Sequence, residues 1–402
     1  MKTYFNLPHE VVFCKKCVIS NQRPCSHPEF KHTRERAGAK YMHIDDDGIC
    51  DACKNHEIKE QTDWSSREND LLQLLDKHRS KNGEYDCIIP GSGGKDSAMQ
   101  AHLLKDKYGM NPLTVTWSPI MYTDYGYENW KNWIEIGGFD NVSIKANGHV
   151  MKTLTRLSLQ NLLHPFQTFM YGQKNLMPKI AAKFGIPLIF YGESEVDYGN
   201  SIAETSALRD KYYWCVKDYE NIYLGGVSLE ELKEVHGLDI KDLNLFLPPT
   251  EKEINNQNIE VRYLGHYIKW VPQEAYYYSV EHTGFKARPF RTQGTYSKYN
   301  SIDDKIDDLH YYTTYIKYGL GRASYDASQE IRNKHITREE GVALVERFDG
   351  EFPDKYFNEV MEYIEMEPEE FHKLCDEFRS PHLWRKDENS WVLKTNVNQK
   401  KV

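Results

Sequence analysis

The chain has 402 residues, of which 40% are hydrophobic and 28% are charged, and its formal net charge at neutral pH is −9. This length and composition fit two or three globular domains and exclude a disordered chain, a collagen-like repeat and a disulfide-dense scaffold. The acidic balance argues against nucleic-acid binding, because neutralising phosphates requires clustered lysine and arginine side chains.

We recognise no targeting signal that would place the protein outside the cytoplasm. The first ten residues lack the apolar core of a secretory signal, and the apolar runs are too short to cross a membrane. We therefore expect a cytoplasmic protein without a membrane span. In that reducing compartment the eight cysteines are expected to be metal ligands, nucleophiles or core residues rather than disulfides.

Composition and the pattern of apolar residues divide the chain into three regions. Residues 1–60 are rich in cysteine, histidine and proline and are expected to form a zinc-ribbon-like segment. Residues 61–250 alternate short apolar runs with helical stretches, which predicts an α/β domain with a parallel sheet. Residues 251–402 are mostly helical in pattern, and we assign them to substrate or partner binding.

The N-terminal region contains two Cys-x2-Cys pairs, Cys14/Cys17 and Cys50/Cys53. Each pair can form a knuckle that presents two thiolates, and four thiolates suit one tetrahedral Zn²⁺ ion. A structural zinc would supply the folding energy that this apolar-poor region lacks. Two alternatives stay open: an iron–sulfur cluster on the same thiolates, and replacement of one ligand by a residue of the spacer, which holds Cys25, His27 and His43.

The strongest signal for catalysis is the run Ile88–Ser97, IIPGSGGKDS, in which an apolar strand passes through a glycine-rich turn into a helix. Glycines let backbone N–H groups approach an anion closely, and the helix N-terminus adds a positive dipole end. The Walker A pattern fails because Lys95 is followed by Asp96, and the dinucleotide fingerprint fails because Asp96 replaces its third small residue. The turn is predicted to bind a phosphate group, with a purely structural turn as the alternative.

Further elements follow the same alternation of strands and helices. Strands are expected at residues 85–89, 113–117, 142–145, 187–191 and 222–224. Helices are expected at residues 96–108, 127–136, 150–163 and 177–184. In a parallel sheet of this kind, ligands bind at the carboxyl ends of the strands. In the C-terminal region, two stretches have the pattern of capping boxes that open helices, Ser301–Asp304 and Thr337–Glu340.

Several other polar residues have more than one interpretation. We expect Cys87, Cys215 and Cys375 to be core residues, because aromatic or apolar residues surround them in sequence. Four acids resemble a metal cluster but are better explained as a favourable helix N-terminus: Asp303, Asp304, Asp307 and Asp308. Three arginines can grip a carboxylate or a phosphate, although most arginines are solvated: Arg288, Arg291 and Arg322.

Taken together, the cysteine pairs and the loop Ser92–Ser97 resemble the N-acetyl sugar amidotransferases of bacterial surface-glycan pathways. These enzymes belong to the PP-loop ATP pyrophosphatases and make acetamidino groups on pseudaminic-type or mannuronic-type sugars. The resemblance continues through further motifs in order: Asp47–Cys50, Leu113–Trp117, Tyr171–Gln173, Ile189–Glu193, Gly294–Tyr296, Ile302–Lys305 and Thr337–Glu340. It implies a PP-loop ATP pyrophosphatase fold for the central region.

The resemblance also implies roles for individual residues. The loop would hold the pyrophosphate of ATP, with a lysine neutralising its charge and an aspartate, Asp96, holding Mg²⁺; the residues concerned are Ser92, Gly93, Gly94, Lys95, Asp96 and Ser97. Thr116 and Trp117 end the second strand, where related folds bind adenine, although Trp117 fits a core position equally well. Glu193 follows the fourth strand and is assigned to catalysis, through magnesium or ammonia, with a helix cap as the alternative.

The implied reaction adenylates the acetamido oxygen of an N-acetylated sugar, free or nucleotide-linked, and replaces that oxygen with ammonia. Ammonia would come from a glutaminase subunit and a barrel synthase subunit similar to those of imidazole-glycerol-phosphate synthase, because no glutaminase signature stands out in this chain. The expected small ligands are ATP, Mg²⁺ and Zn²⁺. The rival hypotheses are a tRNA-modifying enzyme with the same loop, either a thiolase or a lysidine-type ligase, and a non-catalytic nucleotide-binding subunit.

Overall fold

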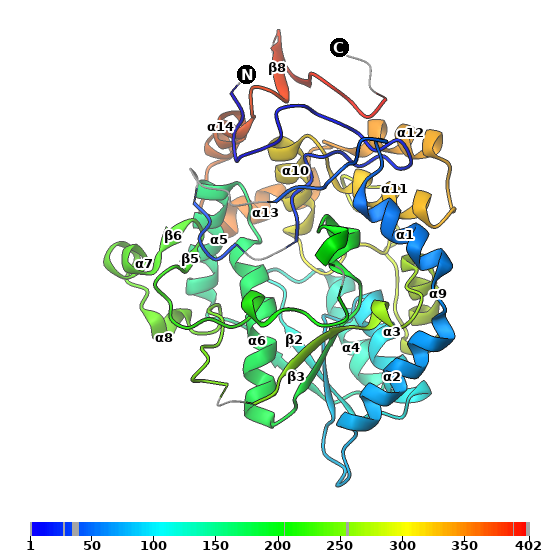
Figure 1. The fold of residues 1–402 in the computed structure, drawn as a ribbon. Coiled ribbons are helices and arrows are strands. Elements are labelled where there is room, and N and C mark those ends of the chain that lie inside the picture. Colours follow the sequence, from blue (N-terminus) through cyan, green and yellow to red (C-terminus); the bar gives the residue numbers. More distant parts are fainter. Residues whose placement is uncertain are drawn as a thin grey trace.

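The computed structural model describes residues 2–26, 29–33, 40–204, 206–254, 257–388 and 390–398. The strands of its main sheet lie in the lower half of the molecule, and most helices from the last third of the chain lie in the upper half (Figure 1). The N-terminal segment runs across the top, over these helices, before α1 descends along one side (Figure 1). The upper half therefore combines both ends of the chain.

The central element is a five-stranded sheet in the order β3-β2-β1-β4-β7, and every neighbouring pair is parallel. Its strands are β1 (Cys87–Pro90), β2 (Pro112–Trp117), β3 (Asn141–Ile144), β4 (Leu188–Tyr191) and β7 (Glu260–Tyr263). The predicted α/β class with a parallel sheet is confirmed, as are the first four predicted strands.

The remaining strands form two small antiparallel hairpins. These are β5 (Tyr223–Leu224) with β6 (Val227–Ser228), and β8 (Trp384–Asp387) with β9 (Ser390–Leu393). The strand expected at residues 222–224 thus exists, but it lies outside the main sheet. The fifth sheet strand is β7, beyond residue 250, so the sheet extends past the limit we placed between the second and third regions. Its pattern of alternating burial is that of an edge strand, which gives only a weak apolar signal.

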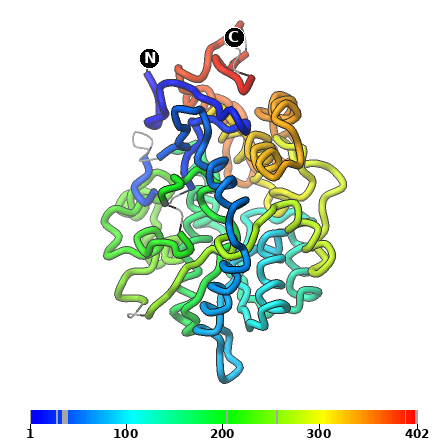
Figure 2. Tube along the Cα trace, turned by 45° about the vertical axis from the view of Figure 1, so that its right-hand side comes forward, coloured from blue at the N-terminus to red at the C-terminus, as the bar shows by residue number. Residues whose placement is uncertain are grey.

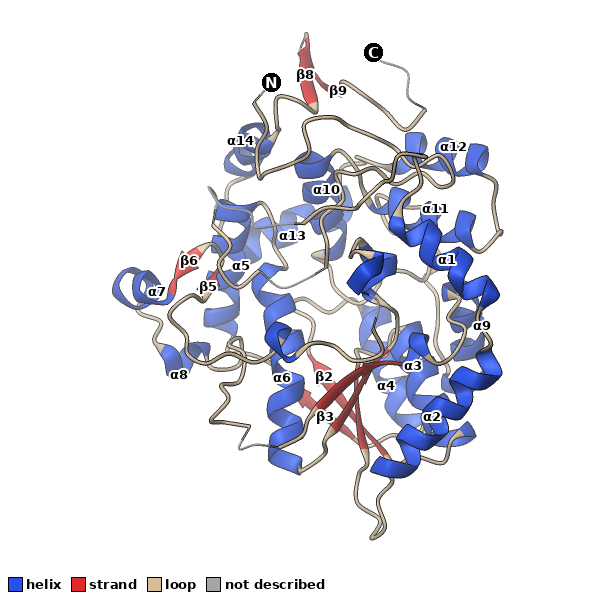
Figure 3. Cartoon of the chain, in the orientation of Figure 1, coloured by secondary structure: helices blue, strands red, loops and turns tan. Residues whose placement is uncertain are grey.

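Helices cover both faces of the sheet (Figure 3). One face packs against α2 (Trp64–His78), α3 (Lys95–His102), α4 (Asp124–Glu135) and α9 (Pro272–Thr283). The other packs against α5 (Gly148–Leu162) and α6 (Gln167–Phe184). Side chains of β1 alternate between these layers, because Ile88 joins the second core while Cys87 and Ile89 join the first. Cys87 is therefore a core residue, as predicted.

The helices outside these two layers lie mainly in the upper half. They are α1 (Asp51–Gln61), α7 (Leu229–His236), α8 (Ile240–Leu243), α10 (Asp307–Tyr318), α11 (Arg322–Arg332), α12 (Arg338–Phe348), α13 (Asp354–Ile364) and α14 (Pro368–Phe378). The π-helical turn η1 (Leu103–Lys107) continues α3, and the short 3-10 helix η2 (Glu195–Tyr198) follows β4. Cys215 and Cys375 are both buried in the larger core, as expected.

One of the two predicted capping boxes is present. Thr337 caps α12, and the side chain of Glu340 returns the hydrogen bond to the Thr337 backbone. The prediction for Ser301–Asp304 was wrong, since α10 begins only at Asp307. The Asp304 carboxylate instead accepts hydrogen bonds from the backbone of the segment after β2, including Ile120 N at 2.6 Å. The Asp304 side chain, which a local capping box would have used, therefore makes a long-range contact with Ile120.

The two ends of the chain lie close together at the top of the molecule (Figure 2). The Tyr4 backbone N–H donates to Ser380 Oγ at 3.0 Å, and Gln22 Oε1 lies 3.1 Å from His382 Nε2. The buried cysteines of the N-terminal region share an apolar cluster with Leu383 and Trp384. The apolar core of the N-terminal region thus includes side chains from the C-terminal region.

Candidate functional site

A cavity of about 610 Å³ lies between the carboxyl end of the sheet and the helical upper half. The strand order changes direction at β1, since β2 lies on one side of it and β4 on the other. In open parallel sheets the crevice at such a switch point is the usual ligand site. Here the loop after β1 and Glu193 after β4 both line the cavity. The fold therefore brings together residues that are about a hundred positions apart in sequence.

The glycine-rich loop has a conformation that depends on its glycines. Gly93 has φ +86°, and a Cβ atom there would lie 2.6 Å from the backbone oxygen of Asn129 in α4. Gly94 is the N-cap residue of α3, and a Cβ atom there would meet only Ser92 Oγ, at 3.9 Å. The loop passes close to α4 and delivers the first turn of α3 to the cavity. Unpaired N–H groups at a helix start favour anions.

Gly93→Ala is expected to lower the free energy of unfolding by about 2 kcal/mol, because alanine is strained at positive φ and its methyl group meets Asn129. Gly94→Ala is the matched control, since φ −64° and the free space there accept a methyl group. Urea unfolding of both variants measures the difference. Equal stability of the two would contradict this account of the loop.

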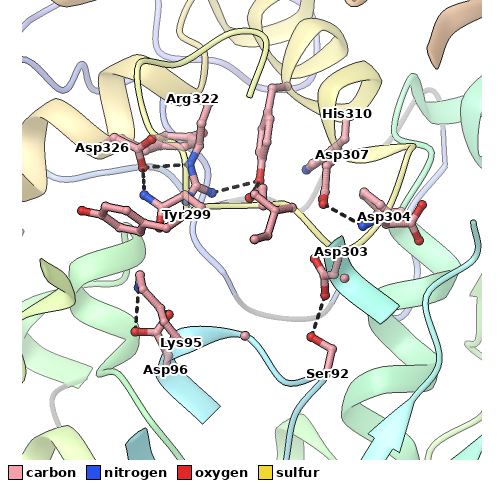
Figure 4. Close-up of a pocket in the computed structure, with 18 of the residues that line it drawn as sticks. Ser92, Lys95, Asp96, Tyr299, Asp303, Asp304, Asp307, His310, Arg322 and Asp326 are labelled. Atoms are coloured by element: carbon pink, nitrogen blue, oxygen red, sulfur yellow. Dashed lines mark hydrogen bonds and ion pairs between the residues drawn. The ribbon is translucent and has the colours of Figure 1, made fainter. Parts of the chain in front are cut away.

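Lys95 and Asp96 stand side by side at the start of α3. Only 5% of Lys95 is exposed, and its Nζ donates to both carboxylate oxygens of Asp96 at 2.8 and 2.6 Å (Figure 4). Both residues line the cavity. The pair thus presents a cation and a carboxylate at the same point of the cavity, and their roles toward a phosphate and a metal ion stay predictions.

The other predicted loop residues divide into two groups. Ser92 lines the cavity, and its Oγ donates to the Asp303 carboxylate at 2.6 Å. Ser97 donates its hydroxyl back to the Gly94 carbonyl at 3.0 Å, and neither it nor Gly93 lines the cavity. These two residues therefore shape the loop in this structure rather than face the cavity.

Glu193 lies at the cavity and is half-buried. Burial raises its pKa to about 8, and the negative charge of Asp96 adds to the shift while Lys95 opposes it. A carboxyl group with a pKa in this range can release or take up a proton near neutral pH. Its place beside Asp96 is consistent with the predicted catalytic role, which stays a prediction.

The raised pKa of Glu193 has a measurable effect on stability. Between about pH 4.5 and about pH 8 the folded protein keeps a proton on Glu193 that the unfolded chain has lost, so stability must fall as pH rises. Glu193→Gln removes this titration, and the variant should gain stability relative to the parent protein as pH rises through that window. Urea unfolding of both proteins without nucleotide at about pH 5 and about pH 8 tests this. A constant difference between them would argue against the shift.

An acidic wall faces the loop across the cavity (Figure 4). It consists of Asp303, Asp304 and Asp307, and burial raises the pKa of Asp304 to about 7. The helix-start explanation from the sequence holds for Asp307 and Asp308, which lie in the first turn of α10, but not for the other two. Asp303 and Asp304 lie in the extended segment before α10, where long-range contacts hold them.

The three predicted anion-binding arginines have different surroundings. Arg322 lines the cavity, with its Nε donating to Asp326 at 2.8 Å. Arg291 forms a two-pronged ion pair with Glu351, both distances being 2.6 Å. Arg288 is buried away from this cavity. Arg322 is thus the one of these three that can meet a ligand in the cavity.

Thr116 and Trp117 do not reach the cavity. Thr116 is fully buried and accepts a hydrogen bond from Asn141 Nδ2 at 3.0 Å. Trp117 packs edge-on against Phe246 and lies directly over Gly172, where a Cβ would come within 2.2 Å of its ring. The core interpretation that we left open for Trp117 fits this structure, and the predicted adenine contact stays without support.

The four predicted metal ligands come together in the N-terminal region. All four are buried, and their sulfur atoms lie within 4.8 Å of one another. The Sγ atoms of Cys17 and Cys50 are 3.7 Å apart, and those of Cys14 and Cys53 are 3.9 Å apart. Sulfurs at about 2.3 Å from a tetrahedral zinc ion are separated by about 3.8 Å, so the thiols fit that ion.

The four thiols interact closely with one another. Hydrogen bonds from the other three thiols lower the pKa of Cys14, whereas hydrogen bonds with Cys14 and Cys17 raise the pKa of Cys50 and Cys53. The Arg338 guanidinium donates to the carbonyls of Cys17 and Cys14 at 3.2 and 3.4 Å. Cys25 and His43 are not part of the cluster, and His27 lies outside the described residues. The described structure therefore offers four cysteine ligands and leaves no vacant position for catalysis.

Residues 293–398 match a family model described as "LPS biosynthesis protein WbpG-like, C-terminal domain". This match points to a role in LPS or glycan biosynthesis. The matched region supplies the acidic wall of the cavity together with Tyr299, Arg322 and Asp326. The upper wall of the site is thus the part of the chain that resembles LPS biosynthesis proteins.

A second comparison covers less of the chain. A stretch of 76 residues, 19% of this chain, is 32% identical to the uncharacterized protein MJ1599 of Methanocaldococcus jannaschii, and it spans 27% of that protein. Among the described residues, no helix combines the length and apolarity that crossing a bilayer requires.

Proposed function

We propose that the protein is an ATP-dependent amidotransferase of the PP-loop ATP pyrophosphatase type, acting on an N-acetylated sugar in surface-glycan biosynthesis. The observation that carries this proposal is the glycine loop at the sheet's switch point, with Lys95, Asp96 and Glu193 at one cavity. The WbpG-like match of residues 293–398 supports the class of pathway.

In this proposal the pyrophosphate part of ATP lies on the loop and the first turn of α3. The Lys95 ammonium leaves its ion pair with Asp96 and binds the phosphate oxygens, because a polyphosphate carries more negative charge than one carboxylate. The Asp96 carboxylate is then free to hold Mg²⁺. When bound, that ion would neutralise charge that develops on the departing pyrophosphate.

The second substrate occupies the remainder of the cavity, below Arg322 and the acidic wall. Its acetamido oxygen attacks the α-phosphorus of ATP, the bond to pyrophosphate breaks, and an O-adenylated imidate forms. Ammonia then adds to the imidate carbon, AMP leaves with the oxygen, and the sugar retains an acetamidino group. In this proposal the ionised form of Glu193, whose population grows as pH approaches about 8, accepts a proton from the attacking ammonia, which becomes acidic once it bonds to carbon.

Ammonia must reach the cavity uncharged, because ammonium has no lone pair for the attack. Ammonium predominates near neutral pH, so a protected supply from other proteins suits this chemistry. We therefore include a glutaminase and a barrel-shaped synthase as partners in the proposal. High ammonium concentrations replace them in a test.

The purified protein, incubated with ATP, Mg²⁺, concentrated ammonium and candidate N-acetylated sugars, should form AMP and a sugar lighter by about 1 Da. Omitting the sugar should abolish AMP formation, which separates the reaction from simple ATP hydrolysis. ADP as the nucleotide product would contradict the proposal. AMP formation that requires tRNA in place of a sugar would favour the tRNA-modifying alternative.

A further inference from the structure

Arg23 is a buried cation at the cavity that the proposed chemistry does not use. It lies in the spacer between the two cysteine pairs, only 5% of the residue is exposed, and it lines the same cavity as the glycine loop. Its guanidinium carbon lies 4.4 Å from the ring centre of Tyr325 and 5.7 Å from that of Tyr198. Both rings also line the cavity. The guanidinium group therefore lies against two aromatic walls of this space.

The charge of Arg23 has no anionic partner within the described part of the chain. None of the described carboxylates forms an ion pair with its guanidinium group, and Asp197, which attracts it electrostatically, is itself paired with Lys59 at 2.6 Å. Arg322 on the same cavity differs, since Asp326 and the Tyr311 hydroxyl satisfy it. The nitrogens of Arg23 are not among the buried unpaired atoms of the described residues, so they reach the open cavity. A guanidinium group that is largely removed from bulk water without an acidic partner is unfavourable, so an anion bound in the cavity would stabilise it.

The backbone around Arg23 holds the side chain in place. The Arg23 carbonyl accepts from Met42 N at 2.8 Å, and its N–H donates to Ser20 O at 3.2 Å. Gly199, at φ +100°, lies against the side chain, since a Cβ there would be 3.5 Å from both Cδ and Nε of Arg23. A guanidinium group fixed on aromatic faces keeps its edge free for two parallel hydrogen bonds to an oxyanion.

We propose that Arg23 binds an oxyanion of the acceptor sugar, either a carboxylate on the ring or a phosphate of an attached nucleotide. This inference rests on the proposed function, which requires a sugar in this cavity. ATP has its own anion site at the loop and α3, whereas Arg23 belongs to a wall that the N-terminal segment, η2 and α11 build. Arg23 would thus select charged acceptors over neutral N-acetylated sugars.

Binding measurements without turnover test this directly. Titration calorimetry would compare N-acetylglucosamine, the N-acetylated uronic acid of the same ring, and UDP-N-acetylglucosamine. The parent protein should bind at least one of the two charged probes at least tenfold more tightly than the neutral sugar. The charged probe that binds more tightly than the neutral sugar shows whether the oxyanion is a ring carboxylate or a nucleotide phosphate.

Arg23→Gln should remove that preference while affinity for ATP stays unchanged, and Arg23→Lys should retain part of it. Arg347→Gln, at an exposed position of α12, makes the same charge change and should leave every affinity as it was. Metal content and the melting temperature of each variant show whether it is folded. The inference is overturned if a charged probe binds Arg23→Gln as tightly as it binds the parent protein. It is also overturned if the variant loses affinity for ATP alone, or if the parent protein binds charged and neutral probes equally well. The proposed function fails separately, if no AMP forms.

Discussion

Asp96→Asn is expected to reduce AMP formation by about a hundredfold or more while the protein stays folded. The amide keeps the size of the side chain but loses the negative charge that would hold Mg²⁺. Lys95 also loses the negative charge of the partner that its Nζ contacts at 2.6 Å, although the amide oxygen can still accept a hydrogen bond. The measurement is the initial rate of AMP release with saturating ATP, ammonium and acceptor sugar.

Asp106→Asn serves as the control for that experiment, because Asp106 is exposed in η1, which continues the helix from Asp96. Its rate should equal that of the parent protein. Circular dichroism and urea unfolding would exclude a general loss of structure in either variant. A fully active Asp96→Asn protein would remove the loop from the catalytic centre and leave the reaction without its proposed metal site.

Cys50→Ser should release the bound metal and destabilise residues 1–60. Cys50 is fully buried, and its sulfur lies 3.7 Å from that of Cys17, so a hydroxyl group there leaves three thiolates for an ion that needs four ligands. Elemental analysis should find close to one zinc per parent chain and much less in the variant, and limited proteolysis should cut the N-terminal region faster.

Cys25→Ser is the matched control, since Cys25 lies in the spacer but outside the four-sulfur cluster. It should keep the metal and resist the protease as well as the parent protein does. Iron in place of zinc would favour the iron–sulfur alternative on the same ligands. Unchanged metal content in Cys50→Ser would show that the proposed ligands are wrong.

The features that could be predicted from the sequence are those that local order determines. The strand, glycine turn and helix around Lys95 are contiguous, so their residue types indicate the loop directly. The same holds for each cysteine pair. The joining of the two pairs into one cluster follows from metal chemistry, which demands four ligands rather than two.

Features that depend on distant contacts were missed or misassigned. The Ser301–Asp304 pattern suits a helix cap, but the Asp304 carboxylate binds the backbone of Ile120 and Met121 instead. Asp303 became part of the cavity because Ser92 faces it from another element. Nothing in the sequence singled out Arg23, since an arginine in a polar spacer is ordinarily solvated. Its burial at the cavity is visible only in the folded structure.

The contacts of Tyr4 and Gln22 with residues 380–382 determine when during synthesis this part of the fold can form. Gln22 precedes Arg23 and meets His382, while Tyr4 is tied to Ser380. A nascent chain that has already exposed its glycine loop still lacks these partners until residues 380–382 leave the ribosome. The wall that carries Arg23 is therefore completed only after His382 has emerged, and a chain truncated before that residue would retain the glycine loop without the packing that supports Arg23.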